Sequence, residues 1–247
     1  MRASIHPSVS KLEGHLNKDV RAADKEARVV DEDVAAVFTR YDPFWGGQVV
    51  LAAAILLDLL LADQLTVGPK WLLPALELAA LIGLTLAEPH PRMRDSLLRR
   101  RLALTLIALV TAANTYSLIL LIHFLVDGGK AHAHALIGSG VVLWVTNVLL
   151  FGVWYWQLDG GGPTARHRRR RPHPDFLFVQ MTEPEFAPRG WHPTLVDYLY
   201  TSFTNATAFS PTDTMPLTPM AKALMTAQSI TALATIGLVV ARAVNIL

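Results

Sequence analysis

Long blocks of apolar residues alternate with short polar segments along most of this chain. Five of the blocks approach or exceed the roughly 17–25 residues that a helix needs to cross the hydrocarbon core of a bilayer. They lie at residues 47–66, 71–87, 102–126, 135–157 and 220–247. The pattern therefore predicts an all-α membrane protein with five transmembrane helices, the first two of which form a hairpin around a Gly-Pro turn.

The first 45 residues follow a different pattern. Val9, Leu12, Leu16, Val20 and Ala23 recur at steps of three and four residues, which is typical of an amphipathic helix. We expect a helical arm that packs on the membrane part or on a neighbouring subunit. A membrane-surface anchor is the alternative, but the polar face mixes acids and bases rather than being rich in lysine and arginine.

Composition supports the membrane interpretation. Hydrophobic residues make up 52% of the 247 positions and charged residues 17%, whereas soluble domains carry about a quarter charged residues. The absence of cysteine excludes disulfides, thiolate metal ligands and cysteine nucleophiles. A net charge of +2 gives no reason to expect a nucleic-acid partner. Since no phosphate-binding loop, zinc-protease motif or nucleophile elbow occurs either, we expect neither an enzyme nor a bound cofactor or metal.

The arginines are concentrated in two loops. One cluster follows the second predicted span at residues 92–101, and the other follows the fourth span at 166–171. With five spans these two loops lie on the same side of the membrane. The positive-inside rule then predicts a multi-pass protein with a cytoplasmic N-terminus.

Between the fourth and fifth predicted spans lies a segment that is neither a span nor an ordinary loop. Residues 195–203 predict a helix too short to cross a bilayer, and a hydroxyl-rich stretch with two prolines, 204–216, follows it. Non-helical backbone at membrane depth is tolerated only where protein buries it or where it lines a water-filled cavity. The segment therefore predicts a re-entrant loop beside a cavity or pore.

The run ATAFSPTDTMPLT, residues 206–218, resembles the pore loop of tetrameric potassium channels, in which a pore helix precedes Ala-Thr-Thr-Val-Gly-Tyr-Gly-Asp and then a proline. Ala206, Thr207, Asp213 and Pro216 match that pattern without gaps. The resemblance covers residues 144–247 and implies an outer helix, a pore helix, a filter strand and an inner helix around the axis of a homotetramer. It implies three regions: an N-terminal arm at 1–45, three spans at 46–134 and a channel-like pore module at 135–247.

The whole chain also resembles a group of uncharacterised bacterial integral membrane proteins. The matching positions are Tyr200, Phe203, Thr207, Phe209 and Asp213. This second resemblance implies location in the bacterial inner membrane and brings no activity with it.

The predicted filter differs from a potassium filter at decisive positions. Ser210 and Thr212 stand where the filter has glycines, and Pro211 stands where it has tyrosine. Threonine tolerates positive φ badly and proline fixes φ near −65°, so these residues do not favour a strand that turns its carbonyls inward. We expect instead a weakly selective pore for monovalent cations such as K⁺ or Na⁺. Its lining would come from Thr207, Ala208, Phe209, Ser210, Pro211, Thr212 and Asp213.

The side of the membrane from which this loop enters is open at this point. Potassium channels carry the filter outside, whereas the arginine distribution puts this loop on the cytoplasmic side. Either the pore is inverted, as in ionotropic glutamate receptors, or the charge rule fails for this chain.

Polar residues within the last span recur on one helical face, and Gly237 lies beside that face. They line a pore or form hydrogen bonds to other helices, and the sequence favours neither. The candidate pore-lining residues of this helix are Gln228, Thr231, Thr235, Gly237 and Arg242.

Asp58 and Glu77 lie within the predicted hairpin, where ionisable groups are costly and are usually paired or in contact with water. They suggest an alternative function, a proton- or cation-coupled transporter, beside the plainer interpretation of a structural ion pair or a protonated carboxyl. A non-conducting membrane scaffold, with the arm and the arginine-rich loop as docking surfaces, is a third possibility.

Overall fold

The computed structural model describes residues 45–61, 71, 74–75, 77–79, 81–82, 97–126, 133–167, 173–188, 191–207 and 214–244. The predicted N-terminal arm (1–44), the arginine run at 168–171 and the predicted filter residues 208–213 lie outside this part of the chain.

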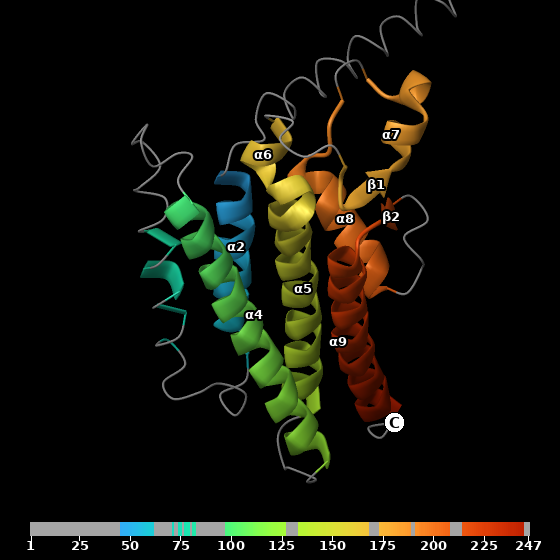
Figure 1. Ribbon diagram of the computed structural model, residues 1–247. Helices are drawn as coiled ribbons and strands as arrows, with labels where there is room; N and C mark the ends of the chain where they lie inside the picture. Colours follow the sequence, from blue (N-terminus) through green and yellow to red (C-terminus); the bar gives the residue numbers. More distant parts are fainter. Residues whose placement is uncertain are drawn as a thin grey trace, which may run out of the picture.

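Long helices dominate the described part (Figure 1). They are α2 (Trp45–Asp58), α4 (Leu97–Val126), α5 (Ala133–Leu158) and α9 (Pro219–Val244). Three stretches within the described residues are long and apolar enough to cross a membrane: Arg100–Leu125, Leu136–Gly161 and Pro219–Ala241. The mostly helical prediction is therefore confirmed, and three of the helices could cross a membrane by their length and composition. α2 is apolar but shorter, and the second predicted span is described only in part, with helical residues at 74–75, 77–79 and 81–82.

Short elements gather near the end of the bundle where α5 finishes and α9 begins (Figure 1). In chain order they are η2 (Asp159–Gly161), α6 (Pro163–His167), β1 (Phe176–Phe178), α7 (Val179–Thr182), η3 (Pro184–Phe186), α8 (Leu195–Ala206) and β2 (Thr214–Pro216). β1 and β2 pair antiparallel, with Leu177 opposite Met215. This small sheet departs from the all-α prediction, and it ties the segment before α9 to the segment after α6.

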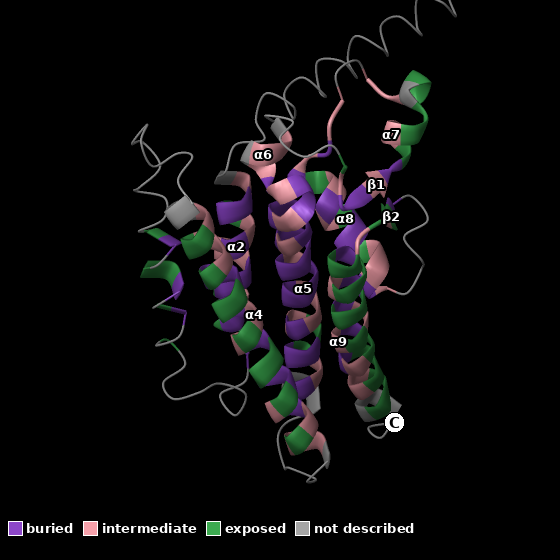
Figure 2. Cartoon of the chain, in the orientation of Figure 1, coloured by how far each residue is buried: buried purple, intermediate pink, exposed green. Residues whose placement is uncertain are grey.

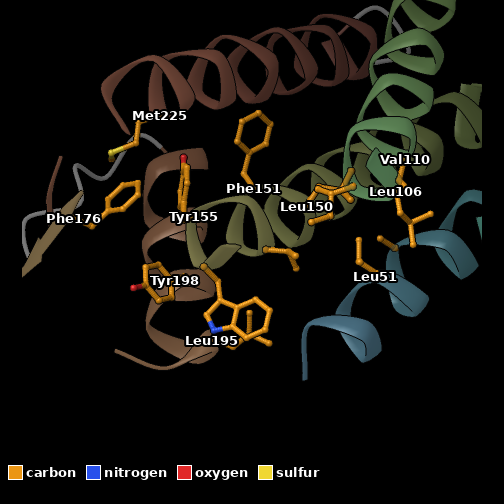
Figure 3. Close-up of a cluster of buried hydrophobic side chains, with 14 of the residues drawn as sticks. Leu51, Leu106, Val110, Leu150, Phe151, Tyr155, Phe176, Leu195, Tyr198 and Met225 are labelled. Atoms are coloured by element: carbon orange, nitrogen blue, oxygen red, sulfur yellow. The ribbon is translucent and has the colours of Figure 1, made fainter. Parts of the chain in front are cut away.

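Helix α5 is the centre of the bundle. It packs against α2, α4, α8 and α9, and its membrane-length stretch is 61% buried, compared with 39% for α4 and 22% for α9 (Figure 2). The main apolar core surrounds the second half of α5. Leu150 lies in one cluster with Leu51 of α2 and Leu106 of α4, while Tyr155 packs against Phe176, whose ring also contacts Tyr198 (Figure 3). Such an arrangement follows from the sequence of α5, which is apolar on every side.

Small residues let two helices approach α5 closely. A Cβ atom on Gly47 of α2 would lie 2.7 Å from the ring of Trp156. A Cβ atom on Gly152 would lie 2.6 Å from Cδ2 of Leu199 and 3.1 Å from its Cα. The second contact involves backbone, so α8 can lie this close to α5 only because residue 152 has no side chain.

We expect Gly152→Ala to destabilise the protein by about 1–3 kcal/mol, because the new methyl group forces α8 away from α5. The thermal unfolding temperature of the purified protein in detergent measures the effect. Gly138→Ala, on the same helix with no atom within 4 Å of the added Cβ, is the control. It should leave stability unchanged or raise it by up to about 1 kcal/mol through helix propensity. Equal losses in both variants would contradict the close α5–α8 contact.

Candidate functional site

The half-length helix α8 has a well-defined start. The carboxylate of Asp197 accepts hydrogen bonds from the backbone N–H of Thr194 at 2.7 Å and from its hydroxyl at 2.8 Å. Negative charge in the first turn also interacts favourably with the helix dipole. Leu195, Tyr198, Ser202 and Ala206 then face the protein interior, in helical register. The predicted short helix is thus confirmed, and it runs to Ala206.

Helix α8 ends beside the middle of two membrane-length helices. Ala206 packs with Val148 of α5 and Ala232 of α9 in one buried cluster. Val148 stands at the middle of the stretch Leu136–Gly161, and Ala232 stands near the middle of Pro219–Ala241. Helix α8 therefore runs from the level at which α5 ends to about half the length of α5.

A glutamine of α9 joins the three helices through both ends of its side-chain amide. The Nε2 of Gln228 donates to the hydroxyl of Ser202 at 2.6 Å and to its carbonyl at 2.9 Å. The Oε1 accepts from the hydroxyl of Tyr155 and from Nδ2 of Asn205, the latter at 2.8 Å. Ser202 in turn donates to the carbonyl of Val148 at 2.7 Å. All four hydrogen-bonding positions of the amide are used.

Asn205 extends this network along α9. Its Nδ2 also donates to the carbonyl of Met225 at 2.9 Å, and its Oδ1 accepts from the hydroxyl of Ser229 at 3.2 Å. The Nδ2 of Asn147 reaches the carbonyl of Gln228 at 3.5 Å. We call Tyr155, Ser202, Asn205 and Gln228 the amide network.

A second polar centre forms where α5 ends. Oδ1 of the fully buried Asp159 accepts from the backbone N–H of Asp175 at 2.6 Å and of Phe176 at 3.2 Å, and Oδ2 accepts from the hydroxyl of Tyr198. Asp175 accepts from the N–H of Gly160 at 2.9 Å. One carboxylate thus holds the end of α5, the start of β1 and the first half of α8 together.

Arg166 completes this centre. Its Nη1 donates to the carbonyls of Trp156 at 2.6 Å and Asp159 at 2.8 Å, and its guanidinium lies over the ring of Tyr198, 5.0 Å from the centroid. Burial raises the pKa of Tyr198 well above its usual range, against the opposing effect of Arg166. The phenol therefore stays protonated and remains a donor to Asp159. Arg166, predicted as part of the second arginine cluster, caps carbonyls at the end of α5 and in the turn that follows it.

Hydrogen bonds also hold the segment that leads into α9. Thr214 in β2 is buried, and its hydroxyl lies 3.1 Å from that of Thr201 in α8. Leu217 donates from its N–H to the carbonyl of Asp175 at 2.8 Å. Helix α8 ends at half depth. Thr214 nevertheless lies beside Thr201, which is roughly one to two helical turns nearer the start of α8 than its last residue.

The predicted pore residues fall in three groups. Thr207 is half-buried at the end of α8, where its hydroxyl lies within hydrogen-bond distance of the carbonyls of Phe203 and Thr204. The residues that follow it, Ala208, Phe209, Ser210, Pro211, Thr212 and Asp213, lie outside the described residues. The third group is on α9.

Gln228 and Thr235 lie on the face of α9 that packs inside the protomer. Thr231 is half-buried and donates to the carbonyl of Ala227, and the Arg242 side chain lies outside the described part of the chain. Gly237 lies on the opposite, exposed face. Of the two interpretations of the polar face, the contacts of Gln228 favour hydrogen bonding between helices.

Asp58 and Glu77 are both buried, with exposed fractions of 6% and 0%. Neither carboxyl group has a hydrogen-bond partner within the described residues. Within the same part of the chain no three His, Cys, Asp or Glu side chains gather as a metal site would require.

Sequence reasoning missed most of the amide network and the whole Asp159 centre. Tyr155 lies in the fourth predicted span, Ser202 in the predicted short helix and Asn205 in the hydroxyl-rich stretch, and the sequence pattern assigned none of them a role of its own. A usable signal was present for Asp159, because a carboxylate at the end of a long apolar helix needs donors nearby.

Comparisons with protein-family models, with curated proteins and with solved structures find no match to this chain.

We expect Gln228→Leu to destabilise the protein by roughly 1–3 kcal/mol, because it leaves the buried Ser202, Asn205 and Tyr155 groups without their partner. Thermal unfolding in detergent measures this. Thr226→Val, two residues earlier on the exposed face, is the control, since its hydroxyl bonds only to the carbonyl of Lys222 in its own helix. An unfolding temperature as high as that of the control would refute the structural role of the amide network.

Proposed function

We propose that this protein is a channel-like membrane protein that assembles as a homotetramer in the cell membrane and conducts monovalent cations without strong selectivity. The observation that carries the proposal is the depth of α8. Twelve residues make a helix of about 18 Å, and the hydrocarbon core is about 30 Å thick. A capped half-length helix that ends at the middle of two membrane-length helices is the scaffold that a re-entrant pore loop needs.

The polarity of α8 supports conduction of cations rather than anions. The carbonyl end of a helix carries a partial negative charge of about half an electron. In α8 this end is Ala206, at half depth, while the start is capped near the end of the bundle. Four such ends around a common axis favour positive charge where a bilayer offers no water.

The segment 208–213 follows directly and supplies the narrow part of the proposed pore. In a tetramer Asp213 contributes a ring of four carboxylates, which favours cations, and Ser210 and Thr212 add hydroxyls. This part of the proposal rests on the resemblance of residues 206–218 to potassium-channel pore loops.

Helix α9 has a free face for neighbouring copies. Lys222, Thr226, Ile230, Leu233 and Gly237 are exposed at steps of three and four residues, opposite the amide network. The exposed Val196 and Phe203 of α8 add to the apolar surface of this half of the protein. We assign this α9 face to contacts between copies and to the wall of the pore below Asp213.

The direction of entry follows from the arginines. Arg100 lies near Gly162, so the start of α4 and the turn after α5 lie at the same end of the bundle. The α8 helix begins at this same end. If the positive-inside rule holds, the pore loop enters from the cytoplasmic side and the pore is inverted relative to potassium channels.

We expect purified protein in liposomes to pass K⁺ and Na⁺ under a membrane potential, measured by ion-selective dyes or in planar bilayers. Asp213→Ala should lower cation flux at least tenfold, and Thr212→Trp should abolish it by blocking the narrow part. Glu185→Gln, an exposed carboxylate in the η3 linker, is the matched control and should conduct normally.

Two results would overturn the proposal. One is a monomer in mild detergent and in native-membrane particles, because a single copy cannot enclose the axis. The other is no flux at any voltage or pH from protein that is folded and inserted, which favours a scaffold.

A further inference from the structure

Two separate apolar clusters occupy successive levels of the α2–α4–α5 bundle. The larger one includes Ile55 of α2, Val110 of α4 and Leu150 of α5. The smaller one includes Leu61, just after α2, with Leu118 of α4 and Leu143 of α5. Buried polar residues occupy the level between the two clusters.

Each helix places a buried polar residue at this intermediate level, and α5 places two, of which Asn147 reaches the carbonyl of Gln228 in α9. Asp58 lies three residues from Ile55 and three from Leu61. Asn114 lies four residues from both Val110 and Leu118. Thr146 lies three residues from Leu143 and four from Leu150. Residues three or four apart share a helix face, so all three side chains face the same interior as the leucines around them.

Glu77 joins the group from the second predicted span. It lies four residues before Leu81, which belongs to the larger cluster, so the same spacing rule turns it inward. We call Asp58, Glu77, Asn114 and Thr146 the oxygen layer.

The oxygen layer has six buried oxygens without a hydrogen-bond partner among the described residues. They are both carboxylate oxygens of Asp58 and of Glu77, Oδ1 of Asn114 and Oγ1 of Thr146. None of the four residues is more than 6% exposed. Buried polar atoms are rarely left without a partner, so six such oxygens at one level make this layer a candidate for ligand binding.

The chemistry of the layer selects the class of ligand. All six atoms are oxygens, and residues 55–61, 110–118 and 143–150 contain no lysine, arginine or histidine to neutralise the acids. Carboxylate, amide and hydroxyl oxygens are the ligands of hard cations, which take about six of them. Two ionised carboxylates at this burial are strongly unfavourable, so they either take up protons or share a bound cation.

We propose that the oxygen layer binds a hard metal cation inside the α2–α4–α5 bundle, held by both carboxylates, the Asn114 amide and the Thr146 hydroxyl. Na⁺ and Ca²⁺ share this chemistry, and the experiment separates them. The site is independent of the proposed pore, because none of its residues belongs to α8, the 208–213 segment or α9.

The test measures thermal unfolding of the full chain in detergent, where no flux is needed. NaCl, KCl, CaCl₂ and MgCl₂ are each titrated against choline chloride at constant ionic strength. One cation should raise the unfolding temperature saturably, by roughly 5–10 °C at a hundredfold excess over its Kd. A response to NaCl identifies a monovalent site, and a response to CaCl₂ or MgCl₂ identifies a divalent one.

Variants locate the effect. Asp58→Asn and Glu77→Gln should abolish the shift, while Glu185→Gln should keep it. Thr146→Val removes one neutral oxygen at nearly constant volume and should weaken the cation at least tenfold, which keeps the test decisive if the acid variants do not fold. The proposal is overturned if no cation shifts the wild type. It is equally overturned if Asp58→Asn and Thr146→Val respond to the cations as the wild type does.

Discussion

The side-chain amide of Gln228 is the interaction on which the arrangement of this protein depends. An amide in an apolar interior must find partners for two donors and two acceptor positions, or lose several kcal/mol. Gln228 finds them on α5 and α8 at once. Since hydrogen bonds tolerate little displacement, these contacts fix the height of α8 against both long helices, which apolar packing alone does not do.

Asp159 fixes the same helix at a second point. Its carboxylate holds Tyr198 in the first turn of α8, while the amide network holds Ser202 and Asn205 further along. Two anchors set both the level and the direction of α8. The polar side of α8 is thereby hydrogen-bonded within the chain, while its apolar side and one face of α9 stay exposed. The proposed pore depends on this division.

Hydropathy along the chain predicted the three described membrane-length helices and the half-length helix well, because block length reports directly on bilayer thickness. It did not predict which face of α9 turns inward. In a bilayer, the side chain of a glutamine on an apolar helix can form its hydrogen bonds equally well to water in a pore or to another helix. Only the positions of Ser202 and Tyr155 show that Gln228 bonds to other helices. The β1–β2 sheet was missed because Phe176–Phe178 is too short for a periodic signal, and the Asp159 centre because its members are far apart in sequence.

The pairing of Thr214 with Thr201, together with the β1–β2 ladder, has a consequence for how this protein can evolve. Residues 208–213 join two points that are both fastened to the same rigid frame. Both ends of this stretch are held by residues outside it, so the points at which the chain enters and leaves it do not depend on the side chains within it. Descendants of this chain can therefore exchange the side chains of that stretch without moving its two anchors.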